Sequence, residues 1–338
     1  MAEAPLVELR GIVKRFPGLV ANDHVSLELH AGEVHALLGE NGAGKTTLMN
    51  ILTGLYRPDG GEIVRDGAPV TFRSPRNAID AGIGMVHQHF KLVDTLTVAE
   101  NVVLGWHAPR WWLGRGAGAR QVEELARLYR MPVHADARIW QLSVGEQQRV
   151  EILKAIYRGA DVLILDEPTA VLTPQEADDL YTIVRGMANE GKAIVFITHK
   201  LDEVLAVADR ITVLRAGKNA GDARRGEVDA RALARMMVGR DVVLADRPLG
   251  REPGAPVLRL EGVSARNDRG LPGLVDLSLE VQAGQIFGIA GVAGNGQREL
   301  AEVVTGLRGV TAGRILVGDR DLANRSARVL KFGRRRTR

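Results

Sequence analysis

Cysteine is absent from this 338-residue chain, and aromatic residues make up only 4% of it. Without cysteine the chain has no disulfide framework and no thiolate metal site, which fits a reducing compartment. Long apolar runs are also missing, since none approaches the roughly 20 residues that a membrane helix needs. The segment Met1 to Leu6 lacks the charged and apolar regions of a signal peptide. We therefore expect a soluble, non-exported protein with at most a peripheral role at a membrane.

The length and the charge indicate two domains with a nearly neutral body. Hydrophobic residues make up 45% of the chain, which is enough for two cores, since domains usually have about 100–200 residues. The net charge is +4, but the tail 331–338 supplies five positive charges, which leaves −1 for residues 1–330. Such a tail binds nucleic acid or anionic lipid in some proteins. Here we expect a solvated end and no nucleic-acid partner.

Residues 39–47 carry the most specific motif, Gly-Glu-Asn-Gly-Ala-Gly-Lys-Thr-Thr. The motif follows the apolar run 34–38 and precedes the helical pattern 48–55, so it predicts a strand, a glycine loop and a helix. The N–H groups of the loop and the positive end of the helix dipole would hold a polyphosphate. Lys45 would reach the β- and γ-phosphates, and the Thr46 hydroxyl would ligate Mg2+. The alternative is a flexible loop with an exposed lysine, but this spacing arises by chance only about 0.01 times in such a chain.

Two carboxylates and a histidine follow apolar strands further along the chain. The run Val162–Leu165 ends at Asp166 and Glu167, as expected of a central parallel strand with acids at the end where ligands bind. Asp166 would hold Mg2+ through water, and Glu167 would orient or deprotonate an attacking water. The alternative is an ordinary polar turn, but the glycine loop upstream favours catalysis. His199 follows the strand 193–197 and would reach the γ-phosphate side, although a lone histidine is usually structural.

Two other positions each have a structural and a functional interpretation. Phe16 lies in a turn between the alternating, antiparallel strands 6–13 and 25–29, where its ring would either stack on adenine or plug the strands. Ser143 opens a helix as part of a capping box, which by itself predicts only a well-built helix start. Gly145 in the first turn leaves the backbone open, so the functional interpretation is a second phosphate-contacting surface.

Helical periodicity replaces strand alternation over residues 92–158, which we expect to form an α-helical insert. Trp106, Trp111 and Trp112 lie in it among Gly and Pro. They would form either a contact surface for a partner or a cover at the base of the helices. Gln88 ends the apolar run before the insert, beside the expected phosphate site, and carries little information by itself.

The opening of the chain repeats after a Pro- and Gly-rich linker, residues 241–256. Gly291 lies 252 positions after Gly39, and the apolar run Ile286–Ala290 retraces the one before the first glycine loop. A duplicated domain therefore begins here. The positions that match the phosphate lysine and the magnesium-binding threonine hold Gln297 and Arg298 instead.

The second copy is also short. Only 42 residues follow Gly296, whereas the first copy needs 121 from Lys45 to Asp166. This leaves no room for a second helical insert or a second carboxylate strand. We expect residues 257–330 to form a truncated, degenerate domain.

In this order and spacing, the motifs of residues 6–240 resemble the nucleotide-binding cassette of ABC transporters. The resemblance implies an α/β fold, namely a P-loop NTPase cassette with a mostly parallel core sheet, an antiparallel β subdomain and an α-helical insert, followed by a partial second cassette. It also implies ATP and Mg2+ as cofactors and ATP hydrolysis coupled to transport. One departure is Thr173, where many members have an aspartate, and it bears on communication between the two sites.

The resemblance assigns a role to each candidate residue. The residues implied in ATP binding are Phe16, Gly39, Asn41, Gly42, Gly44, Lys45, Thr46, Thr47, Ser143 and Gly145. Those implied in hydrolysis are Lys45, Gln88, the catalytic base Glu167 and the switch histidine His199, and those implied in Mg2+ binding are Thr46, Gln88 and Asp166. Ser143 and Gly145 belong to the signature motif, which contacts the nucleotide of the opposite subunit.

The degenerate loop 291–297 and the segment 86–90 resemble the fused tandem cassettes of sugar and nucleoside importers, nearest the nucleoside group. The implied partners are integral membrane permease subunits, a separate solute-binding protein and a dimerising second cassette, at the cytoplasmic face of the cell membrane. Because each ATP lies between two cassettes, we expect the chain alone to hydrolyse ATP poorly. Pairing of two first cassettes, or a further chain, would complete the site.

Two other functions remain as alternatives. One is a soluble cassette protein that acts on ribosomes or DNA. Ribosome-associated relatives resemble two full cassettes with a long charged helical linker, and DNA-repair relatives carry a long coiled coil. Here the linker is rich in Pro and Gly, and only 97 residues separate Lys45 from Ser143. The other alternative is a truncated, inactive product. The sequence does not identify the transported solute.

Overall fold

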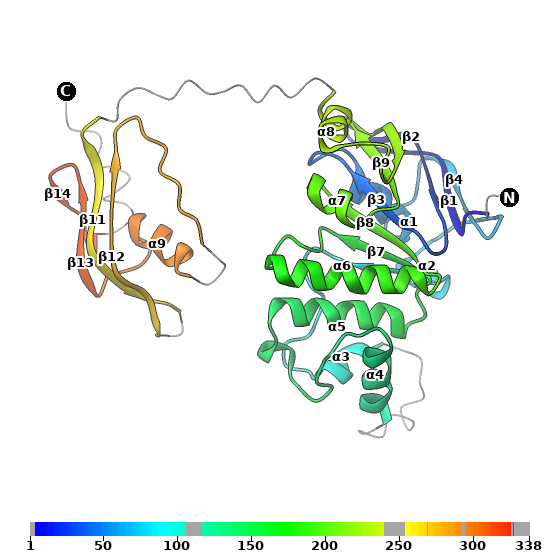
Figure 1. Ribbon diagram of the computed structural model, residues 1–338, viewed down its shortest axis with the longest axis horizontal. Coiled ribbons are helices and arrows are strands. Elements are labelled where there is room, and N and C mark those ends of the chain that lie inside the picture. The colour runs from blue at the N-terminus through cyan, green and yellow to red at the C-terminus, as the bar shows by residue number, and fades with distance from the viewer. Residues whose placement is uncertain are drawn as a thin grey trace. The chain divides into compact units, whose positions relative to one another are not determined.

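The computed structural model describes residues 4–105, 117–239, 254–268, 270–291, 295–325 and 327 (Figure 1). The chain separates into two units, Met1–Val243 and Leu244–Arg338. The three tryptophans of the expected partner surface (106, 111 and 112), most of the expected linker 241–256 and the basic tail 331–338 lie outside the described residues. Among the described helices, none is both long and apolar enough to cross a membrane.

A six-stranded sheet forms the centre of the first unit (Figure 1). Its strands are β3 (Val34–Leu38), β6 (Ile83–Val86), β7 (Val162–Asp166), β8 (Ala193–Thr198), β9 (Arg210–Arg215) and β10 (Lys218–Arg224). Their order is β10-β9-β3-β8-β7-β6, and only the edge strand β10 pairs antiparallel. The middle strands β3, β7 and β8 are buried along their whole length. Because these strands are parallel, the segments that follow β3, β7 and β8 all emerge at the carboxyl-terminal end of the sheet.

A four-stranded antiparallel sheet stands beside the central one. It consists of β1 (Val7–Phe16), β2 (Leu19–Leu29), β4 (Gly60–Arg65) and β5 (Ala68–Val70) in the order β2-β1-β4-β5. The alternation expected over 6–13 and 25–29 is confirmed as the β1–β2 pair, and both strands extend to the hairpin between Phe16 and Leu19. This sheet supports the glycine loop through β2, as described below.

The helices of the first unit pack on both faces of the central sheet and on one another. They are α1 (Lys45–Leu52), α2 (Pro75–Asp80), α3 (Val98–Val103), α4 (Ala117–Leu128), α5 (Val144–Tyr157), α6 (Pro174–Asn189), α7 (Leu201–Val207) and α8 (Ala230–Val238), with a 3-10 turn at Ile139–Gln141. The capping boxes expected at Ser143 and Thr173 both form, since each hydroxyl accepts a hydrogen bond from the N–H group three residues later. These caps fix where α5 and α6 begin.

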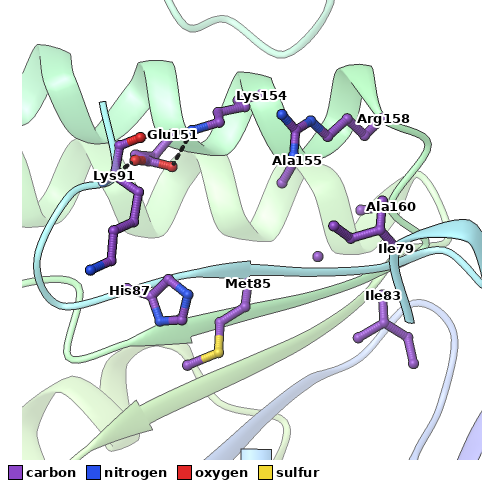
Figure 2. Close-up of a pocket in the computed structure, with 11 residues that line it drawn as sticks. Ile79, Ile83, Met85, His87, Lys91, Glu151, Lys154, Ala155, Arg158 and Ala160 are labelled. Atoms are coloured by element: carbon purple, nitrogen blue, oxygen red, sulfur yellow. Dashed lines mark hydrogen bonds and ion pairs between the residues drawn. The ribbon is translucent and has the colours of Figure 1, made fainter. Parts of the chain in front are cut away.

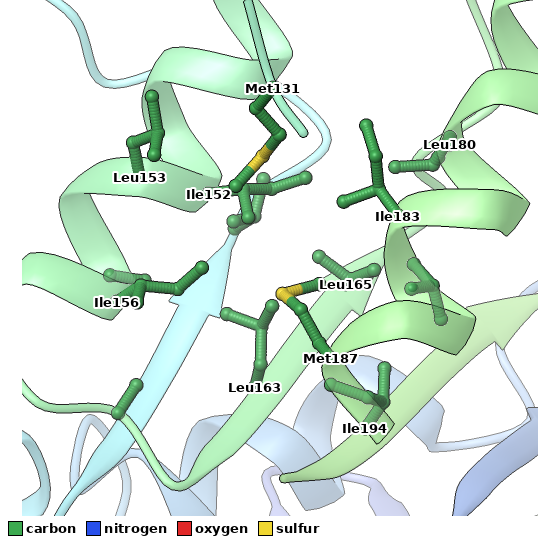
Figure 3. Close-up of a cluster of buried hydrophobic side chains, with 14 of the residues drawn as sticks. Met131, Ile152, Leu153, Ile156, Leu163, Leu165, Leu180, Ile183, Met187 and Ile194 are labelled. Atoms are coloured by element: carbon green, nitrogen blue, oxygen red, sulfur yellow. The ribbon is translucent and has the colours of Figure 1, made fainter. Parts of the chain in front are cut away.

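Alternate residues of β7 separate two cores. Leu163 and Leu165 face a cluster that includes Ile152 of α5 and Met187 of α6 (Figure 3), and all four are fully buried. Val162 and Ile164 face the other side, where α1 and the antiparallel sheet pack. A fully buried side chain of this size contributes about 1.5–3 kcal/mol. The helix α5 therefore belongs to the central core as much as to the expected insert.

The second unit repeats the antiparallel sheet and the first helix. Its elements are β11 (Pro256–Arg266), β12 (Pro272–Gln282), α9 (Gln297–Val304), β13 (Ala312–Val317) and β14 (Arg320–Asp321). The order β12-β11-β13-β14 is that of β2-β1-β4-β5, and the repeat extends to single contacts. A Cβ at Gly61 would overlap the carbonyl oxygen of Gly11, and a Cβ at Gly313 would overlap that of Gly262.

The structural repeat does not include the apolar run Ile286–Ala290, although this run matches β3 in the sequence. These residues have no regular secondary structure, and Ile286 and Ile289 are 84% and 56% exposed. The matching strand β3 is paired on both sides, by β8 and β9. The described part of the second unit provides no parallel strand to pair with 286–290. An apolar run without partners cannot satisfy its backbone as a central strand, so the structural repeat does not extend to these residues.

Candidate active site

Neighbouring backbone packs closely around the glycine loop between β3 and α1. A Cβ at Gly39 would lie 2.5 Å from the carbonyl oxygen of Leu214, and one at Gly44 would overlap that of Ala21. Gly44 also has φ of +98°, a conformation that residues with a side chain rarely adopt. The exposed Gly42 has φ of +83°. The loop therefore requires glycine at these positions for its shape.

The N-terminus of α1 keeps its backbone donors available. Gly44 is the N-cap and has no side chain to accept from them, and no acidic residue lies in the first turn. Unpaired N–H groups at a helix start, together with the helix dipole, favour an anion. Asn41 and Thr46 are exposed beside this end, and Thr47 is half-buried. The arrangement fits a phosphate group.

Lys45 is only 6% exposed, although it is the first residue of α1. Its ammonium donates to the carbonyl oxygens of Gly39 at 2.7 Å and Glu40 at 3.0 Å. Burial lowers the pKa of Lys45, while the charges of Glu167 and Asp166 act in the opposite direction. The lysine is thus held within the loop and interacts electrostatically with the two acids.

The two acids at the end of β7 have different surroundings. Asp166 is 9% exposed, and burial, followed by the charge of Glu167, raises the pKa of its carboxyl, while Lys45 opposes the shift. Glu167 has φ of +47°, which is unusual for a residue with a side chain, and its N–H donates to the carbonyl oxygen of Ile197 at 3.0 Å. This geometry aims the Glu167 side chain away from the strand direction.

The carboxylate of Glu167 lies between two other candidate residues. Nδ1 of His199 is 2.9 Å from Oε1 of Glu167, and the side-chain amide of Gln88 donates to Oε2 at 3.3 Å. These three residues follow β8, β7 and β6, which are neighbours in the sheet. The structure therefore brings together Gln88, Glu167 and His199 from segments about 80 and 30 residues apart, as the parallel sheet dictates.

The two interpretations of Phe16 both have structural support. Its half-buried ring packs edge-on against Tyr56 at 5.6 Å between centroids, and the Lys14 ammonium lies 5.6 Å from the centroid. These contacts are those of a plug. However, Phe16 pairs with Leu19 at the hairpin end, two residues before Ala21, which touches the glycine loop. The ring therefore belongs to the hairpin that borders the loop.

Sequence reasoning missed one residue of the loop's support. Asn22 of β2 is fully buried, and its side-chain amide donates to the carbonyl oxygen of Gly44 at 3.2 Å. A buried asparagine in a strand that otherwise alternates was the available signal, but its partner lies 22 residues away. Nothing local to the sequence identifies that partner.

Ser143 and Gly145 do not join the cluster around Glu167. They lie at the start of α5, which packs on one face of the sheet, whereas α1 packs on the other (Figure 1). Ser143 is exposed and accepts from the Glu146 N–H at 3.2 Å. A Cβ at Gly145 would lie 2.6 Å from Oε1 of Glu176, so the glycine lets α6 approach this end. Within one chain Ser143 is thus exposed away from that cluster, and Gly145 is buried against α6.

A cavity of about 190 Å³ lies behind the segment that follows Gln88 (Figure 2). Ile83 and Met85 of β6 form part of its apolar wall, and its polar rim carries His87, Lys91, Glu151, Lys154 and Arg158. Lys154 donates to the carbonyl oxygen of Lys91 at 3.0 Å and lies 3.7 Å from Glu151. Burial lowers the pKa values of His87, Lys154 and Arg158. Residues of α5 and of the segment around Gln88 thus line the same cavity.

The residues present fit a nucleotide and a magnesium ion. The glycine cradle and the α1 terminus suit a phosphate chain, and Thr46, Asp166 and Gln88 offer the oxygen ligands that Mg2+ prefers. Among the described residues, no cluster of three or more His, Cys, Asp or Glu side chains could hold a metal by itself. In nucleotide sites Mg2+ is usually held by one or two protein ligands together with phosphate and water.

Known proteins provide an independent comparison. The family model described as ABC transporter matches residues 22–170. A glucose import ATP-binding protein of Haloferax volcanii is 51% identical over 97% of this chain and 65% of its own length. A guanosine import ATP-binding protein of Bacillus subtilis is 48% identical over 96% of this chain and 64% of its own length. The chain therefore spans about two thirds of the length of these relatives.

A solved structure shares the fold of the first unit. It is a dimeric, post-hydrolysis state of an ATP-binding cassette bound to ADP and Pi, and it superposes with a TM-score of 0.57. It covers 66% of this chain and all of its own length, at 26% identity. The expected α/β cassette architecture is confirmed by this fold and by the sheets described above. The chain belongs to the ABC transporter family, and its first unit is a nucleotide-binding cassette of that family.

Proposed function

We propose that this chain is the ATP-binding and ATP-hydrolysing subunit of an ABC importer. The observation that carries the proposal is the position of the Glu167 carboxylate, which lies between Gln88 and His199 at the strand edge where Lys45 is held. A base, its orienting neighbours and a phosphate-binding loop are the parts that phosphoryl transfer to water requires. No observation favours action on ribosomes or DNA.

ATP would bind mainly through backbone groups. The loop from Gly39 to Gly44 and the α1 terminus would hold the phosphates, and Lys45 would exchange its contacts with loop carbonyls for the β- and γ-phosphates. Phe16, at the hairpin beside the loop, would contact the base. Asn41 and Thr47 complete the expected ATP-binding set. Thr46, Asp166 and Gln88 would hold Mg2+, which when bound neutralises charge on the phosphates.

Glu167 would act as general base. Its carboxylate would orient a water and accept its proton, which is the role that its half-buried position and its two polar neighbours support. Gln88 would keep the carboxylate oriented from one side. His199 would hold it from the other side and face the γ-phosphate, so both residues act on the water through Glu167.

The ATP site would be completed by a second cassette. Ser143 and Gly145 lie at the start of α5, away from the Glu167 cluster of the same chain, so this helix start would contact a nucleotide bound to a partner. The dimeric cassette structure bound to ADP and Pi supports this arrangement. Burying ATP between two copies stabilises the closed dimer by mass action. We therefore expect turnover per molecule to rise with protein concentration.

We also propose that the second unit is a partial, degenerate cassette. It repeats the strand order of β2-β1-β4-β5 and the glycine before α1, but Gln297 replaces the phosphate lysine. The side chain of Gln297 lies against Gly291, at the place where a Cβ would be. Arg298 lies 2.8 Å from Glu302 and 3.3 Å from Asp268 and is engaged in these ion pairs. Gln297 has no ammonium group for a phosphate, and Arg298 has no hydroxyl for Mg2+.

The partners would be integral membrane permeases at the cytoplasmic face of the membrane, served by a separate solute-binding protein. The cavity beside Gln88 suits a permease segment with apolar and acidic side chains, because its wall is apolar and its rim carries Lys91, Lys154 and Arg158. Since Lys154 holds the carbonyl of Lys91, a partner seated there would act on the Gln88 segment. The relatives named for glucose and guanosine import support a sugar or nucleoside as the solute.

The test is the substitution Glu167→Gln, measured by Mg2+-dependent ATP binding and by steady-state phosphate release. The amide cannot accept the proton of water, so we expect turnover to fall by about 10²–10⁴-fold while ATP affinity stays within about twofold. Asp178→Asn, which makes the same charge change at an exposed position of α6, is the matched control. Unchanged turnover in Glu167→Gln, or no Mg2+-dependent ATP binding by the wild-type chain, would contradict the proposal.

A further inference from the structure

A buried glutamate lies behind the cluster around Glu167. Glu203, in the first turn of α7, is only 7% exposed, and no role has been assigned to it above. Its Oε1 accepts a hydrogen bond from the hydroxyl of Thr169, and its Oε2 accepts from the hydroxyl of Thr198 at 2.7 Å. Both threonines are also buried, at 5% and 2% exposure. A buried carboxylate with both oxygens engaged is costly to disturb, because breaking the contacts leaves an unpaired charge.

The two threonines belong to the segments that carry the candidate base and its histidine. Thr169 lies two residues after Glu167, and Thr198 directly precedes His199. The Glu203 carboxylate therefore joins these two segments through Thr169 and Thr198. A second contact, of 2.9 Å between Glu167 and His199, joins the same two segments. The Glu203 side chain thus restrains the distance between the Glu167 carboxylate and the His199 imidazole.

A lysine completes the bridge. The Lys200 ammonium lies 2.9 Å from Oε1 of Glu203 and 3.4 Å from the carbonyl oxygen of Thr169. The N–H of Lys200 donates to the hydroxyl of Thr198 at 3.1 Å. Thr198 thus receives one hydrogen bond and gives one, which fixes its rotamer. The charge of the carboxylate is balanced without any contact to the glycine loop.

The bridge also explains how Glu167 keeps its unusual backbone conformation. A non-glycine residue with φ of +47° persists only where the surrounding structure over-determines it. On one side, the N–H of Glu167 donates to the carbonyl oxygen of Ile197. On the other side, the chain is fixed two residues later by the bond from Thr169 to Glu203. Loss of either restraint would let the Glu167 carboxylate move relative to His199.

We propose that Glu203 is a positioning residue, which sets the distance between Glu167 and His199 by joining Thr169 to Thr198. Its side chain contacts Thr169, Thr198 and Lys200, and it would act on the reaction only through Glu167 and His199. The inference rests on the proposed function in so far as the positioned groups carry out ATP hydrolysis. A displacement of about 1 Å between reacting groups costs about 10²-fold in rate, so a small release of the bridge is sufficient.

The experiment compares Glu203→Gln, Glu203→Asp and Thr169→Val in the full 338-residue chain. The amide of Glu203→Gln has one acceptor oxygen and no charge, so it cannot serve both threonines and Lys200. We expect kcat for ATP to fall about 10–100-fold in Glu203→Gln, with KM and ATP affinity within about twofold, because the glycine loop is untouched. Glu203→Asp keeps the charge and should recover part of kcat.

A double variant tests whether the residues act as one unit. Thr169→Val should lower kcat by itself, and adding it to Glu203→Gln should cause little further loss, because the same bridge is already broken. Asp209→Asn is the control for instability. Asp209 binds Arg185 at 2.7 Å and the N–H of Val34 at 2.9 Å, at the opposite end of β3. We expect it to lower thermal stability and leave kcat unchanged.

A second measurement needs no nucleotide and separates this inference from the proposed function. The imidazole 1H–15N signals of His199 should shift in Glu203→Gln and stay unchanged in Asp209→Asn, because only the first variant releases the contact with Glu167. An inactive wild type would contradict the proposed function and leave this readout valid. Active Glu203→Gln and Thr169→Val variants with wild-type kcat and unshifted His199 signals would overturn the inference. If Glu203→Gln fails to fold, the kcat of Thr169→Val decides.

Discussion

Val34–Leu38 and Ile286–Ala290 are matched apolar stretches, 252 positions apart, with opposite structures. The first is β3, buried along its whole length at the centre of a six-stranded sheet. The second has no regular structure, and Ile286 is 84% exposed. The difference comes from the neighbours, since β3 pairs with β8 and β9, which arrive from residues 193–215. An apolar pattern specifies a strand only where partners exist to take up its hydrogen bonds.

The two glycine loops extend this comparison to chemistry. In both units a glycine in the left-handed conformation starts the helix, with φ of +98° at Gly44 and +89° at Gly296. Each glycine fits against a carbonyl oxygen of the antiparallel sheet, from Ala21 and Gly273 respectively. The helix-starting glycine and its packing against the antiparallel sheet are thus present twice. The functional side chains are present once, because unit two carries Gln297 in place of Lys45.

Lys45→Gln gives the first unit the residue of the second, and it should have the largest effect. Removing the ammonium removes the charge that faces the phosphates, so we expect ATP turnover to fall about 10²–10³-fold. Mg2+-dependent ATP affinity should fall as well. Phosphate release and equilibrium ATP binding measure the two effects. Gln297→Ala is the matched control and should change neither by more than about twofold. An equal loss in Gln297→Ala would place turnover in unit two.

Leu37→Ala and Ile289→Ala test the structural half of the comparison at matched positions. Leu37 is fully buried between neighbouring strands, so its truncation leaves a cavity and should cost about 3 kcal/mol of unfolding free energy in unit one. Ile289 is 56% exposed, and its truncation should cost less than about 0.5 kcal/mol. Urea unfolding followed by circular dichroism measures both. A large loss in Ile289→Ala would mean that 286–290 is buried in solution.

The comparison also indicates what the sequence could predict. The glycine loop, the β1–β2 pair and the caps of α5 and α6 each have a signal in their own residues, namely the glycine spacing, the alternation and the capping boxes, and the structure contains them as expected. The apolar run 286–290 matches 34–38 in pattern, but the strand β3 also depends on distant partners, which the pattern does not reveal. Asn22 and Glu203 depend on contacts 22 and 34 residues away, so their burial could be suspected from the sequence but their partners could not.

β3 also contains a titratable group that its counterpart lacks. His35 is only 3% exposed, and its Nε2 lies 2.9 Å from the Thr212 hydroxyl. The matching position in unit two is Phe287. Burial, and to a smaller extent the charges of Arg210 and His30, lower the pKa of His35 from 6.5 to about 3. The folded protein therefore keeps this imidazole neutral at pH values where the unfolded chain protonates it.

The smallest of these effects is the pH dependence that follows. Between pH 6.5 and about 3 the unfolded state binds a proton at His35 that the folded state does not, so stability falls as the pH falls through this window. The slope is about 1.4 kcal/mol per pH unit, which gives a loss of about 2 kcal/mol in unit one between pH 7 and pH 5. Urea unfolding at the two pH values measures it. His35→Gln should remove that part of the pH dependence, although the amide will lower stability at pH 7. An unchanged difference between pH 7 and pH 5 in His35→Gln would show that other groups cause it, and that burial of β3 does not control this titration.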